Sequence, residues 1–240
     1  MPRKSVLTPS QKVSLLSFPT SKIEFERYYT LSENDLFIIH QKREIHNRLG
    51  FALMLCCIRY PGISYDVDTV IEDNMMEFVK KQLSIQTEID MQLYFKRETT
   101  RREQLAEIQN LYGYRSLNAK MHASYVELLL PTAKATDNGA IVANKLIELL
   151  RHEMIIVPNI SVIERLCSEA ITIATKWVYE TLLEQCSKMQ LDKLQKLFTS
   201  KPNTNISYLG WLQMRNFVAN PKFILEHIQR LRFIKELDLP

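Results

Sequence analysis

The chain has 240 residues, of which 46% are hydrophobic, so it can bury one large core or two ordinary ones. Glycine (5) and proline (9) are scarce, and this composition favours helices and argues against a turn-rich β-sandwich. The formal net charge of +4 is mild and does not by itself identify a nucleic-acid-binding protein, and no apolar stretch approaches the ~20 residues of a membrane span.

In chain order, the first predicted elements are helices that begin at capping signals. Thr8-Pro9-Ser10-Gln11 combines an N-cap threonine, proline at the first helical position and a glutamine that can reach back. The same spacing recurs at Ser21, Ser32, Thr69, Thr100, Ser161 and Ser187. Stop signals lie at Pro61-Gly62, Gly113 and Pro202. The sequence therefore predicts an all-α protein of about a dozen short helices, with one β-like run over 154–157.

A weak internal repeat predicts two tandem modules. Segment 55–59 aligns with 147–151 at an offset of 92 residues, and 105–112 aligns with 191–198 at an offset of 86. The alternative is that amphipathic helices resemble one another without any duplication. We predict two small multi-helix modules with helix-turn-helix-like elements, residues 1–117 and residues 118–240, the second ending in the start of a linker.

Catalytic and metal-binding patterns do not stand out. The four cysteines, Cys56, Cys57, Cys167 and Cys186, form no C-x-x-C pair, and each is interpreted as a buried reduced thiol. The histidines lack metal-ligand spacing, and no glycine-rich phosphate-binding motif occurs. Tyr28-Tyr29 is best explained by packing. We therefore predict no catalytic residue, metal or cofactor in this chain, and a soluble cytoplasmic protein.

Charge is unevenly distributed along the chain. Residues 40–60 carry four basic and one acidic side chain (4 − 1 = +3), and residues 61–95 carry two and seven (2 − 7 = −5). Residues 185–222 turn basic again (6 − 1 = +5). Alternating basic and acidic blocks can place basic faces on phosphate and acidic faces towards solvent or protein. The alternative is a surface of mixed charge that contacts only solvent.

The most informative local feature is Arg97-Glu98-Thr99-Thr100-Arg101-Arg102-Glu103. Here Thr100 is predicted to cap a helix whose first turn carries Arg101 and Arg102. Positive side chains at a helix N-terminus oppose the macrodipole, so stability does not explain them. A phosphate or a base edge would offset that cost, because reading helices contact DNA through their N-terminal residues. A second candidate reading helix begins at Ser161, with core packing as the alternative for Ile163 and Leu166.

An ordered set of segments resembles the N-terminal region of class II replicative transposases, the Tn-three family. The segments are Met1-Pro2-Arg3, Tyr28 to Leu36, His46-Asn47-Arg48-Leu49-Gly50-Phe51-Ala52, Arg59-Tyr60-Pro61-Gly62, Thr100 to Ile108, Tyr112-Gly113, Ile155-Ile156-Val157-Pro158, Ile163 to Cys167, and His227 to Arg232. The chain departs from the family pattern at Lys4 and at His122-Ala123-Ser124, which we treat as neutral. The resemblance covers nearly the whole chain.

The resemblance implies binding of double-stranded DNA at the terminal inverted repeats of a bacterial transposon. It also implies that strand transfer belongs to a later RNase-H-like domain with three metal-binding acidic residues, so we expect a non-catalytic fragment of a protein that is a homodimer at full length. The predicted DNA-binding residues are Lys42, Arg43, Arg48, Arg97, Thr99, Thr100, Arg101, Arg102 and Arg115 in the first module, and Arg165, Lys193, Lys196 and Lys201 in the second. The alternatives are a helical protein–protein platform and an unrecognised hydrolase.

Overall fold

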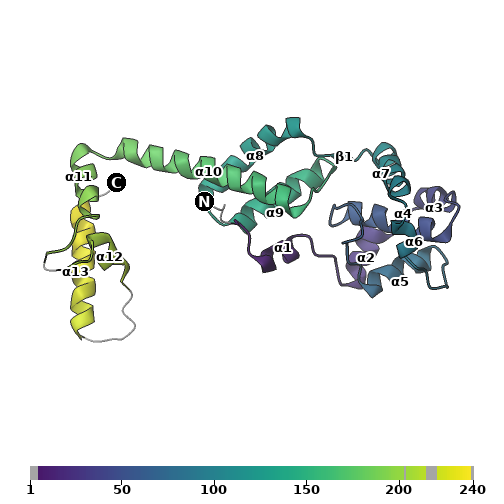
Figure 1. Cartoon of the computed structure of the whole chain (residues 1–240), viewed down its shortest axis with the longest axis horizontal. Helices are drawn as coiled ribbons and strands as arrows, with labels where there is room; N and C mark the ends of the chain where they lie inside the picture. The colour runs from purple at the N-terminus through teal and green to yellow at the C-terminus, as the bar shows by residue number, and fades with distance from the viewer. Residues whose placement is uncertain (1–4, 203, 215–220, 239–240) are drawn as a thin grey trace. The chain divides into compact units, whose positions relative to one another are not determined.

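The computed structural model describes residues 5–202, 204–214 and 221–238. The chain forms two compact units, Met1–Ile173 and Ala174–Pro240, and α10 (Ile160–Gln185) begins in the first and ends in the second. The all-α prediction is confirmed, because the described residues hold helices α1 to α13 and two strands of two residues each. Figure 1 labels the helices and β1. No described helix is long and apolar enough to cross a membrane.

Four predicted helix starts are confirmed by complete capping boxes. Thr8, Ser21, Ser32 and Ser187 each accept a hydrogen bond from a backbone amide three residues on, and the side chain at that later position bonds back. These residues begin α1 (Pro9–Leu15), α2 (Lys22–Tyr29), α3 (Glu33–His40) and α11 (Lys188–Lys196). Each box is a local device, so a short window of sequence is enough to predict it.

Three predicted starts are wrong. Thr69 closes a turn with Asp66, and α5 (Asp73–Gln82) begins beyond it with Glu72 at its N-cap. Thr100 lies inside α7 (Glu98–Tyr112), where Glu98 occupies the first turn and complements the helix dipole better than arginine would. Ser161 lies inside α10, because the helix is capped two positions earlier, where the Asn159 side chain accepts from the Val162 amide.

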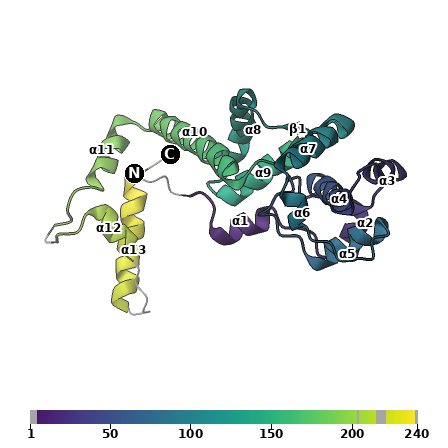
Figure 2. The same ribbon diagram turned by 45° about the vertical axis from the view of Figure 1, so that its right-hand side comes forward.

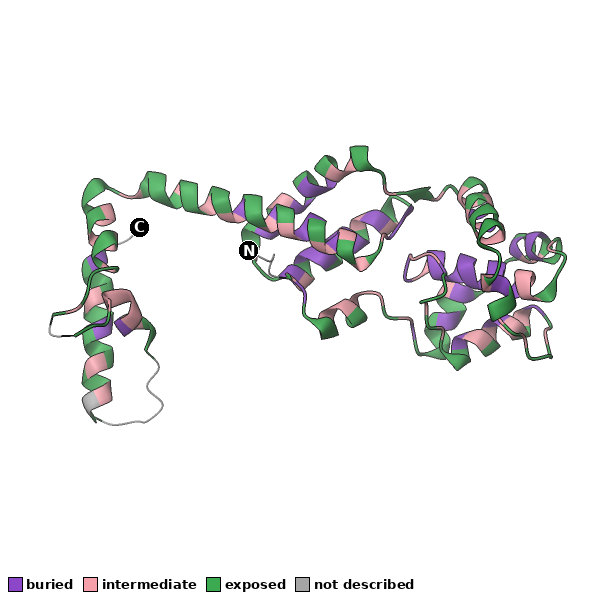
Figure 3. Ribbon diagram, in the orientation of Figure 1, coloured by how far each residue is buried: buried purple, intermediate pink, exposed green. Residues whose placement is uncertain are grey.

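The first core surrounds α4 (Ile45–Arg59), in which residues 49–58 are all buried. A helix that is apolar on every side must be covered on every side, and α2, α3, α5, α6 (Gln92–Phe95) and α7 pack around it. Figure 3 shows α4 as an almost continuously buried element. Gly50 allows this packing, because a Cβ there would lie 2.3 Å from the Tyr94 ring.

A polar network ties three of these helices together. The Asp35 carboxylate is 1% exposed and accepts from the Arg59 guanidinium at 2.8 Å and from the Tyr112 hydroxyl at 2.5 Å. Burial opposes ionisation of Asp35, but these hydrogen bonds outweigh it and hold its pKa below the ordinary value of 3.8. The network therefore joins α3, α4 and α7 around a buried negative charge.

The second part of this unit contains α8 (His122–Ala135), α9 (Gly139–His152), the short 3-10 helix Ala119–Met121 and the start of α10. Helices α8 and α9 lie side by side in Figures 1 and 2, and α1 packs on α9. Ile163 and Leu166 are fully buried, which confirms the core-packing alternative for both residues. Glu164 holds the N-terminal segment, because its carboxylate accepts from Ser5 and from Lys12.

The two parts of the unit meet at a short parallel ladder. Strand β1 (Arg115–Ser116) pairs with β2 (Ile155–Ile156), which lies within the β-like run predicted over 154–157. Nearby, Arg151 donates to the Pro61 carbonyl at 2.7 Å, and the Val157 amide donates to the Gly62 carbonyl at 2.8 Å. The predicted boundary between residues 117 and 118 falls just after β1 and stays a prediction, as do the helix-turn-helix elements.

The second unit has its own small core. Helix α13 (Pro221–Leu237) packs against α12 (Tyr208–Gln213) and α11, with the Tyr208 and Phe233 rings stacked at 4.9 Å. Trp211 donates to Glu226, which also accepts from the buried Arg230. The predicted contributor Arg215 to the basic block lies outside the described residues.

Candidate nucleic-acid interface

The start of α7 presents a polar face to solvent. Thr99, Arg102, Glu103, Ala106 and Asn110 are all exposed. Their spacing of three or four residues places them on one side of the helix, while Gln104 and Ile108 are buried on the other. Figure 3 shows this exposed side of α7. Ala106, at the centre of this face, is small enough to let the helix approach another surface closely. Longer polar side chains lie on either side of Ala106.

Two arginines at this end of α7 are available to an anion. Arg97 stands at the N-cap position with an exposed side chain, and that side chain makes no ion pair or hydrogen bond with any residue that the structure describes. Arg102 is 77% exposed and pairs with Glu98 one turn earlier at 2.5 Å. An exposed pair of this kind contributes only about 0.3–0.5 kcal/mol, so a phosphate can compete with Glu98 for Arg102.

Arg101 is only half-exposed at the start of α7. Its guanidinium lies 5.5 Å from the centre of the Phe95 ring, and its Nε atom is buried without a hydrogen-bond partner. It lines a cavity of about 130 Å³ together with Asp66, Glu98 and Arg102. Arg101 and Arg102 therefore line the same cavity but differ in exposure, and Thr100, which precedes them, is half-buried.

The predicted cluster Lys42, Arg43 and Arg48 lies in and after the turn between α3 and α4. Lys42 is engaged within the fold, since its Nζ lies 2.5 and 2.6 Å from the two carboxylate oxygens of Glu107 on α7. Arg48 donates its Nε to the Lys42 carbonyl at 2.7 Å. Only Arg43 of the three is exposed, and the Lys42 contact places the turn that carries it beside α7.

Arg115 and Arg165 are the other two arginines of the first unit that were predicted to bind DNA. Arg115 is exposed at β1 and donates to the Glu153 carbonyl at 3.3 Å. Arg165 is exposed on α10 and lines a hollow of about 340 Å³ along that helix with Ser168 and Glu169. The structure brings neither of them into contact with the arginines of α7.

The three predicted lysines of the second unit differ in their surroundings. Lys193 on α11 donates to the Glu236 carbonyl at 2.9 Å, whereas Lys196 on the same helix is exposed. The Lys201 ammonium lies 4.0 Å from the centre of the Trp211 ring, a cation–π contact that fixes the side chain within the unit. Lys196 alone is therefore fully available at the surface.

Ala106 and Asn110 lie on the exposed face of α7 but were not among the residues predicted from the sequence. The recurrence of small and polar residues at 99, 102, 103, 106 and 110 is the signal that could have found them, because buried residues alternate with them at helical spacing. The arginine content of the segment pointed only to the first turn of α7, so the later residues of its exposed face were not predicted.

The described residues Cys56, Cys57, Tyr28 and Tyr29 are poorly placed to act as catalytic nucleophiles. Burial raises the pKa of Cys56 to about 12 and places that of Cys57 well above its ordinary value, so both thiols stay protonated near neutral pH. Tyr29 is fully buried, and the Tyr28 ring stacks on Tyr60 at 4.4 Å. No three His, Cys, Asp or Glu side chains gather as metal ligands in the part of the chain that the structure describes.

Residues 6–170 match the family described as a domain of unknown function, DUF4158, and the chain belongs to that family. Along its whole length the chain is homologous to transposases of the Tn3 family. It is 37% identical over 240 residues to the transposases for transposons Tn3926 and Tn21, both of Escherichia coli, and 36% identical over 241 residues to the transposase for transposon Tn501 of Pseudomonas aeruginosa. All of the chain is matched in each case, and it spans 24% of the length of these relatives.

Proposed function

We propose that this chain is the DNA-binding N-terminal region of a transposase and that it binds the terminal inverted repeats of its transposon. Strand cleavage and joining belong to a DDE-type catalytic domain outside this chain, so the chain itself needs no metal or cofactor. The full-length protein acts as a homodimer in this proposal. Homology to transposases supports the general role, and the exposed face of α7 supports the location of the contact.

The observation that carries the proposal is the combination of Arg97, Thr99 and Arg102 at one exposed helix end with Ala106 and Asn110 further along the same face. Arginine can bind guanine or phosphate through two donors, and asparagine can pair with adenine in the same way. Ala106 keeps the middle of the face low enough for the helix to enter a major groove.

The neighbouring basic side chains would then fix the helix on the DNA backbone. Arg43 is exposed on the turn that Lys42 holds against α7, and it has no partner among the described residues. Lys42 acts in this account by positioning α7, since its charge is already matched by Glu107. The remaining predicted basic contacts with exposed side chains are Arg115 and Arg165 in the first unit and Lys196 in the second.

Fluorescence anisotropy with the terminal repeat of the element that encodes the chain tests this assignment. Arg102→Ala and Arg97→Ala should each lower affinity by roughly 1–3 kcal/mol if they read bases, with a larger loss on the repeat than on a scrambled duplex. Lys145→Ala is the matched control, because Lys145 is exposed and also pairs with a glutamate on its own helix. Binding that is unchanged in Arg97→Ala and Arg102→Ala would refute the assignment to α7. Addition of EDTA should leave binding unchanged.

A second candidate function is a helical platform for protein contact, and α13 favours it. Ile224, Ile228 and Leu231 are 56%, 39% and 66% exposed and lie at helical spacing on the side away from Phe233. The occupant we propose is another segment of the transposase, because the homologous proteins are about four times as long as this chain. Ile228→Glu with Leu231→Glu should abolish co-purification with the remainder of the transposase and leave DNA binding intact; retained co-purification would exclude this surface.

A further inference from the structure

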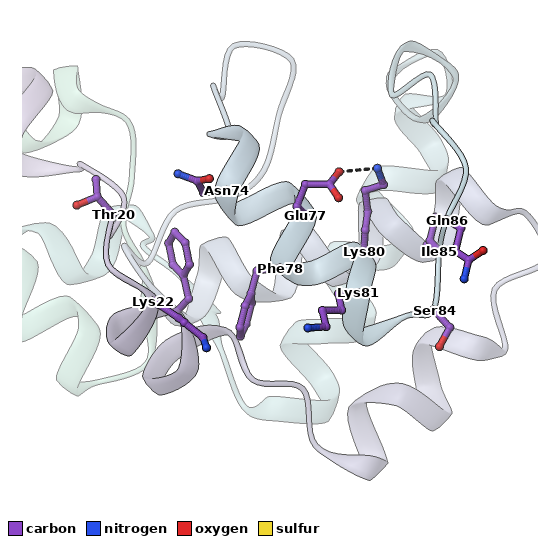
Figure 4. Close-up of a pocket in the computed structure, with 11 residues that line it drawn as sticks. Thr20, Lys22, Asn74, Glu77, Phe78, Lys80, Lys81, Ser84, Ile85 and Gln86 are labelled. Atoms are coloured by element: carbon purple, nitrogen blue, oxygen red, sulfur yellow. Dashed lines mark hydrogen bonds and ion pairs between the residues drawn. The ribbon is translucent and has the colours of Figure 1, made fainter.

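A cavity of about 840 Å³ lies between α2 and α5, and none of its lining residues belongs to the predicted DNA-binding set. Its size falls within the ~300–1,000 Å³ typical of small-molecule sites. It is lined by Phe25 and Phe78, by the basic residues Lys22, Lys80 and Lys81, and by the polar residues Thr20, Asn74, Glu77, Ser84 and Gln86. Figure 4 shows these side chains on α2 and the segment before it, on α5, and on the segment that follows α5.

The cavity carries an excess of positive charge. Three lysines and one glutamate line it (3 − 1 = +2), and Lys80 is matched by Glu77 at 2.6 Å. Lys81 is exposed and has no ion pair among the described residues. Among the described residues Lys22 pairs only with Glu26, at 3.7 Å, and both side chains are largely exposed. Two ammonium groups are therefore available to an anion, since the exposed pair binds Lys22 weakly.

Aromatic surface lies between these two lysines. In the view of Figure 4 the Phe78 ring stands between Lys22 and Lys81. Phe78 is half-buried and its ring centre lies 5.8 Å from that of the buried Phe25. A half-buried ring that lines a cavity beside ammonium groups suits a planar ring that carries a negative group, because stacking and charge act on different parts of one ligand.

Polar groups on the rim can bond to the edge of such a ring. Asn74, Ser84 and Gln86 line the cavity with exposed side chains and supply both donors and acceptors. Ser84 reaches this position through a backbone φ of +55°, which places it in the left-handed region at the end of α5.

We propose that this cavity binds a single nucleotide, with the base stacked on Phe78 and the phosphate between Lys22 and Lys81. The nucleotide is either free in solution or an unstacked nucleotide within DNA, and the chemistry of recognition is the same. The inference does not rest on binding at the transposon end, because no lining residue belongs to the predicted DNA-binding set. Arg97→Ala and Arg102→Ala should therefore leave it unaffected.

Isothermal titration of the purified chain with deoxyadenosine 5′-monophosphate tests the proposal. We expect saturable one-to-one binding that is at least ~10-fold stronger than binding of deoxyadenosine or of inorganic phosphate, because each of these lacks half of the contacts. Lys22→Glu and Lys81→Glu should each weaken it at least ~5-fold. Lys120→Glu is the control, because Lys120 is exposed and lies outside the cavity.

A further variant separates stacking from charge. Phe78→Leu keeps an apolar side chain at the core edge, so it should lower affinity for the mononucleotide and leave that for phosphate unchanged, with circular dichroism to confirm folding. The proposal is overturned if the mononucleotide binds no better than phosphate, or if Lys22→Glu and Lys81→Glu leave its binding unchanged.

Two DNA duplexes distinguish the sources of the nucleotide. One is fully paired and the other carries a single unpaired nucleotide in the same sequence. A preference for the second duplex that is lost in Lys22→Glu and Lys81→Glu identifies DNA as the source. Equal affinity for the two duplexes, together with mononucleotide binding that needs both lysines, identifies a free nucleotide.

Discussion

The Nζ of Lys42 lies 2.5 and 2.6 Å from the two carboxylate oxygens of Glu107, and it also lies 4.6 Å from the centre of the Phe51 ring. This half-buried pair holds the turn before α4 against the middle of α7. Lys42→Met should lower the free energy of unfolding by about 1–2 kcal/mol, between the values for exposed and buried pairs. Urea denaturation measures this loss.

Glu107→Gln distinguishes a positioning role of Lys42 from direct contact with DNA. If Lys42 positions α7, then Glu107→Gln and Lys42→Met both weaken DNA binding, because both loosen the helix. If Lys42 binds phosphate directly, removal of the Glu107 charge strengthens binding, since a negative group near the DNA is lost. Tighter binding by Glu107→Gln would therefore contradict our account of Lys42.

The Asp35 network predicts an acid-dependent loss of stability. Because the folded-state pKa of Asp35 lies below its ordinary value of 3.8, the network stabilises the fold above that pH and this contribution is lost as pH falls through the folded pKa. Asp35→Asn should cost about 2–4 kcal/mol at neutral pH, since it leaves Arg59 without its charged partner. Thermal unfolding from pH 7 to pH 3 should then show a shallower decline for Asp35→Asn than for the parent chain; parallel curves would remove Asp35 as the cause.

Gly50 is predicted to tolerate no side chain. A Cβ at this position would lie 2.3 Å from Tyr94, whose hydroxyl donates to the buried Gln104 on α7. Gly50→Ala should destabilise the chain by about 3 kcal/mol, the upper end of the usual overpacking cost. Gly210→Ala provides the control, since its Cβ would meet Ile206 at 3.1 Å and should shift stability by less than about 1 kcal/mol. Equal unfolding midpoints for the two variants would contradict this packing.

Removal of the Glu98 charge should strengthen DNA binding. Glu98 holds Arg102 at 2.5 Å in an exposed pair, so Glu98→Gln releases Arg102 and also removes a negative charge from the proposed contact. We expect affinity for the terminal repeat to rise about 2- to 5-fold at low salt and the gain to shrink as salt increases. A loss of affinity in Glu98→Gln would place the DNA away from this end of α7.

Ser84 offers a test of backbone strain at the rim of the cavity. A non-glycine residue at φ +55° is strained, and glycine adopts this conformation freely. Ser84→Gly should raise the free energy of unfolding by about 0.5–1 kcal/mol, whereas Ser84→Ala should leave it nearly unchanged. Differential scanning calorimetry of both variants separates the backbone effect from loss of the hydroxyl; a lower transition temperature for Ser84→Gly would contradict it.

Local patterns predicted the fold better than they predicted the site. The boxes at Thr8, Ser21 and Ser32 could be predicted because each involves residues three positions apart. The start of α7 could not be placed by the same rule, because Thr99 and Thr100 are tolerated inside a helix and Glu98 favours the first turn.

Contacts between distant residues account for the remaining differences. Nothing near Lys42 in the sequence reveals that Glu107, 65 residues later, matches its charge. Lys22 and Lys81 come from different helices, so their shared cavity appears only once α2 and α5 are packed together. Arg101 and Arg102 adjoin in the sequence, yet one is packed over Phe95 and the other is exposed.

The most direct test of the central claim is footprinting of this chain on both ends of its own transposon at moderate salt. We predict a protected block within each terminal inverted repeat, with no protection of a scrambled duplex at the same concentration. Arg97→Ala and Arg102→Ala should remove the part of the block that α7 occupies. Equal protection of the repeat and the scrambled sequence would contradict a sequence-specific DNA-binding region.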